Sequence, residues 1–264
     1  MGQQLLDPVS NLLGQCRQIL VIPDRELYLI PFEVLQYPFA TNTYLTEHLA
    51  VSYTLSWKVY EAKRASHQEA VDLSSAKIAL WRDETLQHGA ELGEALERAT
   101  SGGRIHQYAG NDCNTTRWKQ AHGNYDILHF HTHGKSNLHN RDDNKLYFKP
   151  GQDSLQGYDI QAQHFKAYLA VLSACETALG DIQNGEGAFT LARSFQLGGV
   201  QQVVATLWSV EEQQTVRLYS DFYRHLSQGE LPAQALQEAK RSFIQGNGNV
   251  IRHPFFWAGP VLYR

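Results

Sequence analysis

Short apolar runs alternate along most of the chain with segments that have the periodicity of amphipathic helices. From residue 77 onward this pattern predicts strands at 77–81, 104–110, 125–132, 168–174 and 200–208. It predicts helices between and after them, at 89–100, 115–121, 185–199, 210–227 and from Pro232 to near Gly246. Such alternation is typical of an α/β protein whose mostly parallel central sheet is flanked by helices.

The first part of the chain is less regular. Strands are predicted at 18–24 and 49–56, a further strand that runs into a turn or short helix at 26–35, and a helix at 57–70. Later, residues 138–159 predict a hairpin around Pro150-Gly151, and 253–263 is a final apolar segment. No repeat, linker or break in composition divides the chain. We therefore expect one domain over 1–264, with 1–75 as an N-terminal subdomain and 76–264 as the core.

Composition excludes several classes of protein. Hydrophobic residues make up 42% of the chain and charged residues 19%, which is enough apolar material for a sizeable core. The net charge is −4 and no run of Lys or Arg stands out, so we expect no direct contact with nucleic acid. No apolar run approaches membrane-spanning length, and the first residues lack the pattern of a secretory signal. Three cysteines without a CxxC motif suit a reducing compartment, so we expect a cytoplasmic protein with no membrane contact.

Two predicted strands end in reactive side chains. One strand ends in His133-Gly134 and another in Cys175. Sites in open α/β sheets form outside the carboxyl ends of the strands, and neighbouring parallel strands lie about 4.8 Å apart. If these two strands are neighbours, Cys175 is a candidate nucleophile with a histidine partner, and the N–H of Gly134 is a candidate oxyanion donor.

Other interpretations remain open at this point. Cys175 on its own is as typical of a buried, inert thiol. His129, His131 and His133 alternate along one strand and are expected to share a face, where the first two would be core or supporting residues. The His-x-His spacing also fits a metal site. Its further candidate ligands are His139, His164, Asp126, Asp142 and Asp143.

Several motifs in a fixed order resemble the CHAT domain family. The strongest are "YDILHFHTHG" at 125–134, similar to the family's HFATHG motif, and "LAVLSACETALGD" at 169–181. The segments at 19–35, 44–56, 185–215 and 253–259 extend the match over most of the chain. CHAT domains are caspase-like cysteine peptidases, of the clan that includes caspases, separases, gingipains and legumains.

The resemblance implies a caspase-like three-layer fold and distinct roles for the histidines. His133, which directly precedes Gly134, corresponds to the catalytic histidine and would act as general acid and base. Cys175 would attack the peptide carbonyl to form a thioester, while the N–H groups of Gly134 and Cys175 hold the oxyanion. His131 is a departure, since the family usually has a small residue there. No metal or other cofactor is implied.

The resemblance also suggests where a substrate side chain binds. The clan's pocket for the residue before the cleaved bond (P1) corresponds here to Ser173, to Asp83 or Glu84, and to the segment 207–212. In separases an acidic residue of that last segment receives a P1 arginine, which makes Glu211 the first candidate and Glu212 the second. Trp208 is expected either to line an adjacent subsite or to belong to the core. Glu212 also has an ordinary interpretation, as a capping box with Ser209 at the start of the helix.

The sequence therefore favours a cysteine endopeptidase of a bacterial regulatory or defence pathway that cleaves proteins after a basic residue. Its expected partners are a protein substrate and a regulatory protein, such as a tetratricopeptide or other helical-repeat protein. Two alternatives are a catalytically silent interaction module and a metal-dependent hydrolase that uses His131 and His133.

Overall fold

A computed structural model describes residues 5–63, 70–101, 104–135, 144–149, 153–173, 181–183, 187–246 and 252–264. Its strands are β1 (Gln18–Val21), β2 (Ala50–Tyr53), β3 (Lys77–Arg82), β4 (Arg104–Tyr108), β5 (Ile127–His131), β6 (His133–Lys135), β7 (Lys145–Lys149), β8 (Asp153–Gln156), β9 (Leu169–Leu172), β10 (Asp181–Gln183), β11 (Gly187–Phe189), β12 (Gln202–Thr206) and β13 (Pro260–Tyr263). Its α-helices are α2 (Ser10–Leu13), α3 (Trp57–Lys63), α4 (Gly89–Ala99), α5 (Thr115–Ala121), α6 (Gly157–Gln161), α7 (Leu191–Leu197), α8 (Glu212–Ser227) and α9 (Pro232–Gln245).

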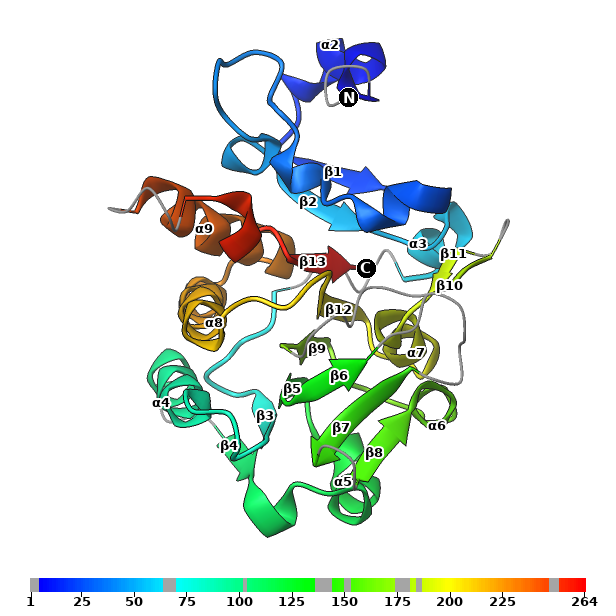
Figure 1. The fold of residues 1–264 in the computed structure, drawn as a ribbon, viewed down its shortest axis with the longest axis vertical. Coiled ribbons are helices and arrows are strands. Elements are labelled where there is room, and N and C mark those ends of the chain that lie inside the picture. The colour runs from blue at the N-terminus through cyan, green and yellow to red at the C-terminus, as the bar shows by residue number, and fades with distance from the viewer. Residues whose placement is uncertain are drawn as a thin grey trace.

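Eight of these strands form one sheet in the order β1-β2-β13-β12-β9-β5-β3-β4. Only the β12–β13 pair is antiparallel among the neighbours of this sheet. Helices α4, α8 and α9 lie on one side of the sheet, and α5, α6 and α7 lie on the other (Figure 1). The prediction of an α/β protein with a mostly parallel central sheet flanked by helices is confirmed.

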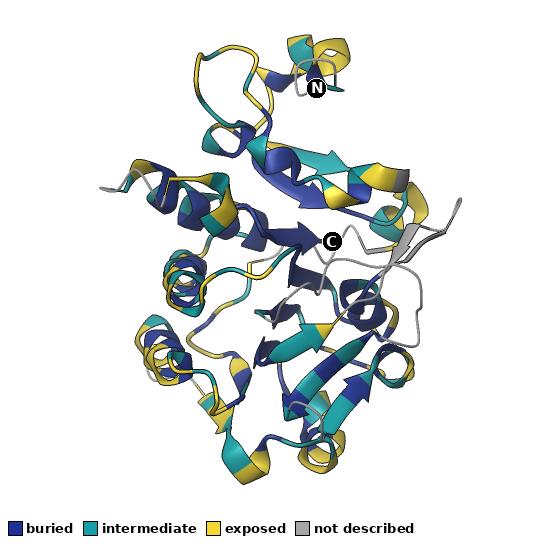
Figure 2. Ribbon diagram, viewed as in Figure 1, coloured by how far each residue is buried: buried dark blue, intermediate teal, exposed yellow. Residues whose placement is uncertain are grey.

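The hydrophobic core is split into two layers by the central sheet. Its inner strands β2, β5, β9, β12 and β13 are buried at every position (Figure 2). Strand β5 shows how the two layers form. Leu128 and Phe130 belong to the layer under α5 and α7, whereas Ile127 belongs to the layer under α8 and α9. Side chains alternate across a strand, so His129 and His131 face the α8 side, together with Ile127.

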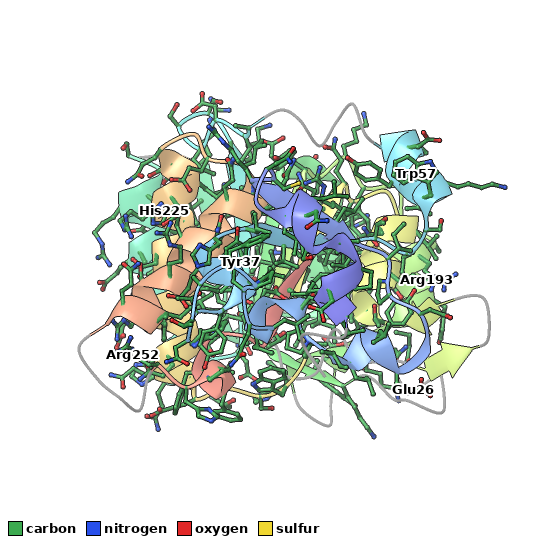
Figure 3. All side chains as sticks on the ribbon, turned by 90° about the horizontal axis from the view of Figure 1, so that it is seen from above. Glu26, Tyr37, Trp57, Arg193, His225 and Arg252 are labelled. Carbon is green, nitrogen blue, oxygen red and sulfur yellow. The ribbon has the colours of Figure 1, made fainter. Side chains whose placement is uncertain are left out.

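The N-terminal strands belong to the same sheet as the rest. β13 pairs with β12 on one side and with β2 on the other, so the last strand in the chain connects β1 and β2 to the other strands. Seen from above, charged side chains such as those of Glu26 and Arg252 lie at the outer edge of the molecule (Figure 3). Within the ranges given above, no helix combines the length and the apolar character needed to cross a membrane.

A buried ion pair joins the N-terminal region to helix α9. Residues Phe32–Val34 form the 3-10 helix η3, and Glu33 within it accepts a 2.6 Å hydrogen bond from Lys240 on α9. The hydroxyl of Tyr53 donates a 2.5 Å hydrogen bond to the second carboxylate oxygen of Glu33. The same hydroxyl accepts a 2.7 Å hydrogen bond from the amide of Phe32. The pair therefore connects η3, β2 and α9 through polar groups that are almost fully buried.

Two predicted elements are wrong in detail. Residues 26–35 form no strand but two 3-10 helices, η2 (Arg25–Leu29) and η3. Pro23 precedes this segment and Pro31 lies within it, and both lack the N–H that a sheet ladder needs. The helix predicted at 185–199 begins only at Leu191, because β11 precedes it and Thr190 caps it by accepting the Arg193 amide. The hairpin is confirmed by the antiparallel pair β7–β8, although its tip at Pro150-Gly151 lies outside the described residues.

Candidate functional site

The two strands that precede the candidate catalytic residues in the sequence are neighbours. β5 pairs in parallel with β9 over Ile127–Phe130 and Leu169–Leu172, which meets the condition on which the strand-end argument depended. Ser173 directly follows β9, and its amide donates to the carbonyl of Phe130 on β5 at 3.0 Å. Cys175 itself lies outside the described residues.

His133 leaves the face that His129 and His131 share. It is the first residue of β6, which pairs with β7 in a separate three-stranded sheet and sets His133 opposite Tyr147. The expectation that three alternating histidines point the same way is therefore wrong, because β5 ends at His131 and the chain then enters another sheet. Gly134 lies in β6 as well, opposite Leu146.

Asp83 is the partner of His133. Its Oδ2 atom lies 3.6 Å from Nε2 of His133, and its side chain is only 6% exposed against 38% for the histidine. The other oxygen accepts the amide of Thr85 at 2.9 Å, and the backbone amide of Asp83 donates to the carbonyl of His131 at 3.0 Å. The 3.6 Å separation is longer than a hydrogen bond, so this oxygen of Asp83 faces the ring of His133 without being hydrogen-bonded to it.

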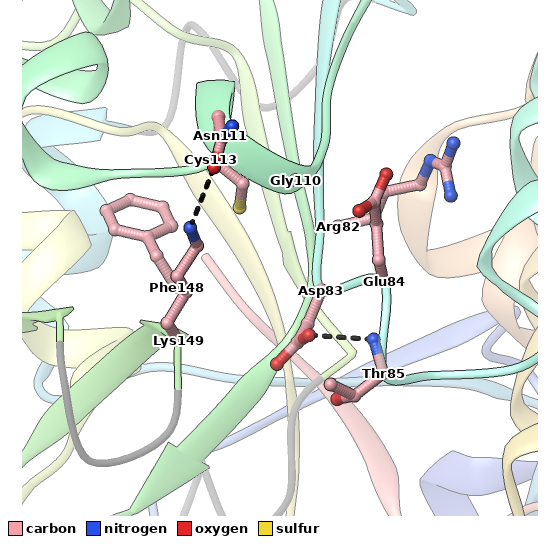
Figure 4. A pocket seen from close by; sticks show the side chains of 9 residues that line it. All are labelled: Arg82, Asp83, Glu84, Thr85, Gly110, Asn111, Cys113, Phe148 and Lys149. Atoms are coloured by element: carbon pink, nitrogen blue, oxygen red, sulfur yellow. Dashed lines mark hydrogen bonds between the residues drawn. The ribbon is translucent and has the colours of Figure 1, made fainter.

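A pocket of about 460 Å³ opens beside this pair. It is lined by the end of β3 with the residues after it, the loop after β4, and β7, and Asp83 lies on its wall (Figure 4). Glu84 and Lys149 also line it, so it offers charges of both signs next to the carboxylate that faces His133. Asp83 and Glu84, both suggested as substrate-binding residues, thus share one pocket.

A second set of polar groups lies on the α8 side of the strand ends. We call Glu212, His131, Ser173, His129 and Tyr223 the polar network. Glu212 lies 3.1 Å from Nε2 of His131, whose Nδ1 lies 3.2 Å from the Ser173 hydroxyl. That hydroxyl lies 2.9 Å from Nε2 of His129, whose Nδ1 lies 2.9 Å from the hydroxyl of Tyr223. His129 is fully buried, which confirms it as a core residue.

Burial determines the protonation of these histidines. It holds the pKa of His129 well below the usual value, and the neighbouring His131 lowers it further. Burial also lowers the pKa of His131, although the hydrogen bond and charge of Glu212 oppose this. For Glu212, burial alone would raise the pKa, but hydrogen bonds from the His88 amide, His131 and the Gln87 amide outweigh it and leave the pKa lowered. The network therefore holds neutral imidazoles beside a carboxylate.

The two acidic candidates for substrate recognition differ in their surroundings. Glu211 is exposed at the N-terminus of α8, and its side chain makes no capping hydrogen bond. Glu212 accepts the amides of His88 at 2.6 Å and Gln87 at 3.0 Å, from the loop after β3. The predicted capping box of Ser209 and Glu212 is therefore wrong, because the carboxylate of Glu212 points toward the loop after β3. Trp208 donates its indole N–H to the carbonyl of Phe255 at 2.8 Å and packs partly against both core layers.

The proposed metal ligands that lie within the described structure do not gather at one site. Asp126 precedes β5 at the opposite end from His133, where its carboxylate accepts the amide of Lys77. His164 is exposed and precedes β9, also at that far end. Across the described residues, no group of three or more His, Cys, Asp or Glu side chains is placed to hold a metal ion. His139, Asp142 and Asp143 lie outside the described residues.

The other two cysteines have no histidine partner in the described structure. Cys16 is exposed, and its thiol donates to the carbonyl of Leu12. Cys113 is buried on the wall of the pocket, and burial raises its pKa to about 12, which keeps it a thiol near neutral pH.

Sequence reasoning missed the contact between Asp83 and His133 and the engagement of Glu212 by His131. The first had a usable signal, because Asp83 directly follows a strand that the pattern predicted, at the same sheet edge as His133. The second had none, since the partners come from β5 and α8, which are far apart in the sequence.

Solved structures of two kinds share this fold. The separase of Saccharomyces cerevisiae, in its complex with securin, aligns with a TM-score of 0.67 at 12% identity over 93% of this chain. The complex of the pro- and mature domains of RgpB from Porphyromonas gingivalis aligns with a TM-score of 0.64 at 10% identity over 100% of this chain. The chain covers 15% of the separase chain and 70% of the RgpB chain. The architecture is therefore the caspase-like one, a cysteine-peptidase-like fold.

The chain belongs to the CHAT domain family, whose model matches residues 1–264. This confirms the family that the His and Cys motifs suggested. No curated protein sequence matches the chain significantly.

Proposed function

We propose that this protein is a cysteine endopeptidase. In this proposal Cys175 attacks the peptide carbonyl and the resulting thioester is hydrolysed by water. His133 shuttles the proton from the thiol to the leaving amine and then from water to the released thiolate. The N–H groups of Gly134 and Cys175 donate to the oxyanion. Asp83 faces the imidazole of His133 and stabilises the positive charge that the ring gains during catalysis, in addition to the substrate contact expected from the sequence.

The observation that carries the proposal is the pairing of His133 with the buried carboxylate of Asp83 at the edge of the sheet where β9 ends. Ser173 lies at that edge and precedes Cys175 by two positions in the sequence. The pairing matters because a histidine that gains a proton during catalysis is stabilised by a fixed negative charge. Membership of the CHAT family supports the same chemistry.

We propose further that the enzyme cleaves after a basic P1 residue, which Glu211 receives, with Trp208 beside the subsite. The exposure of Glu211 at the start of α8 supports this choice over Glu212. Cytoplasmic location, a bacterial regulatory or defence pathway and control by a helical-repeat or other partner protein remain part of the proposal. Separase with securin and RgpB with its pro-domain have been solved as complexes with proteins, which is consistent with such control.

A fluorogenic peptide library that varies only the P1 residue tests this function. We expect hydrolysis after Arg or Lys, complete loss in Cys175→Ala, and no effect of a zinc chelator. Asp83→Asn should lower kcat by about tenfold with little change in KM, because the asparagine keeps the Thr85 contact but removes the charge that stabilises the imidazolium.

Two results would contradict the proposal. Hydrolysis that persists in Cys175→Ala would exclude this nucleophile. If no thiol-directed peptidyl electrophile labels Cys175, with and without partner proteins, the chain is instead an interaction module with a caspase-like fold.

A further inference from the structure

The imidazole of His131 fills the space between the ends of β5 and β9 and the first turns of α4 and α8. Its side chain is 1% exposed. A Cβ atom built on Gly89, the first residue of α4, would lie only 3.1 Å from Cδ2 of His131, so the ring is packed tightly against that helix. A small residue at position 131, as in the family motif, would leave this space open.

The hydrogen bonds of the polar network assign the proton positions. Glu212 only accepts, so His131 carries its proton on Nε2 and its Nδ1 accepts from Ser173. The Ser173 hydroxyl has one proton, which it shares between His131 and the carbonyl of Phe130 at 3.0 Å. It accepts from Nε2–H of His129, whose Nδ1 accepts from Tyr223. Every member is satisfied while both imidazoles are neutral.

The carboxylate of Glu212 is consequently occupied. One oxygen accepts from the His88 amide and from His131, and the other accepts from the Gln87 amide. These three donors connect the carboxylate to the loop after β3 and to β5. The side chain of Glu212 is 23% exposed, but an arginine or lysine from a substrate would have to compete with these donors for its carboxylate, whereas the side chain of Glu211 is exposed and makes no capping hydrogen bond.

We propose that His131 is a specificity-determining residue of the peptidase site. It engages the carboxylate of Glu212, fills the space next to Ser173 with its ring, and leaves Glu211 as the acidic group that meets a basic P1 side chain. This inference rests on the proposed function and deepens it, because it gives Glu212 a structural role and assigns the binding of the substrate side chain to Glu211.

The alanine of the family motif is the informative substitution. His131→Ala removes one donor from Oε1 of Glu212 and opens the space that the ring fills. A charge-assisted hydrogen bond to the carboxylate oxygen that His131 has vacated should then tighten the binding of a P1-Arg peptide by about tenfold relative to a P1-Ala peptide. His131→Gln keeps an N–H donor and a side chain of similar length, so it should retain the wild-type preference.

Equilibrium binding of two peptides that differ only at P1 is the test, with every variant made in the Cys175→Ala background so that no turnover occurs. In that background Glu211→Gln should lower the preference for P1-Arg, and Glu212→Gln should leave it within about twofold. When His131→Ala is also present, Glu212→Gln should remove the gained preference, a coupling that loss of stability alone does not produce. Thermal unfolding of each variant, measured in parallel, identifies any that fail to fold.

The outcomes separate this inference from the function on which it rests. The Cys175→Ala protein and the Cys175→Ala, His131→Ala protein should differ in their preference for P1-Arg. If both fold and their preferences are equal, the proposed role of His131 is wrong, even if the wild-type enzyme cleaves basic peptides. A gain that survives Glu212→Gln would overturn the role of Glu212. If the wild-type protein neither cleaves peptides nor is labelled at Cys175, but the variants bind P1-Arg and P1-Ala peptides as expected, only the peptidase activity is refuted.

Discussion

The buried histidines make the stability of this protein sensitive to pH. His129 and His131 are fully or almost fully buried, and each uses both ring nitrogens in the polar network. Their pKa values lie below the usual value of about 6.5, which the unfolded chain retains. Folding therefore requires neutral imidazoles. The free energy of unfolding is therefore not reduced by these two histidines above about pH 6.5, and it decreases as the pH falls below that value.

We expect the free energy of unfolding to fall by about 1.4 kcal/mol per pH unit for each of the two histidines as the pH decreases from about 6.5 toward their folded pKa values. His129→Gln, which cannot titrate, should reduce this slope by the contribution of one proton. Urea unfolding at about pH 7.5, 6.5 and 5.5 measures it, with His164→Gln at an exposed position as the control. An unchanged slope in His129→Gln would show that the buried imidazole is not the source.

At the level of the elements, the N-terminal segment is held to the helical layer by charge as well as by apolar contact. Glu33 of η3 and Lys240 of α9 are 2% and 1% exposed and lie 2.6 Å apart. Two charges this deeply buried are costly to desolvate and are stable only together. The pair therefore specifies how η3 docks on α9 more than it adds to the free energy of folding.

Removing one partner of this pair should lower the free energy of unfolding far more than removing both charges. Lys240→Met leaves the carboxylate of Glu33 unpaired and should cost about 3–5 kcal/mol in the free energy of unfolding. The double variant Glu33→Gln, Lys240→Met should recover most of that loss, since Gln still accepts from Tyr53.

Urea denaturation compares these variants with Arg241→Met, which breaks the neighbouring but partly exposed pair with Glu238 and should cost less than about 1 kcal/mol. A Lys240→Met protein no less stable than Arg241→Met would contradict the argument.

For the whole molecule, β13 makes the sheet continuous. Its side chains pack into both core layers, with Val261 and Tyr263 on one side and Leu262 on the other. Since β1 and β2 reach the remaining strands only through it, we expect the sheet to unfold as one unit.

Leu262→Ala should lower the free energy of unfolding by about 2–5 kcal/mol, because the side chain is fully buried. Amide hydrogen exchange should report the same loss in β2 and in β9, on opposite sides of β13. Leu197→Ala, at a residue 53% exposed, is the matched control and should cost less than about 0.5 kcal/mol. Faster exchange confined to β2 would indicate that the N-terminal strands unfold separately.

Periodicity along the chain determined most of the elements, and the order of the motifs determined the family. Apolar alternation located β3, β5, β9 and β12, because the side chains of a strand repeat every two residues whatever surrounds them. General rules for parallel sheets made the adjacency of β5 and β9 possible, and the tertiary structure established it. The errors came at Pro31, whose missing N–H breaks a strand-like pattern, and at the start of α7, where β11 intervenes.

Only the tertiary structure decided which polar groups meet. Glu212 fits a local capping box in the sequence, yet its carboxylate accepts from Gln87, His88 and His131. Of three histidines with identical spacing, two enter the α8 side of the core, whereas His133 turns into a second sheet beside Asp83. Hydrogen bonds depend on distance and direction in space, and these partners are brought together by the packing of elements whose local patterns carry no information about one another.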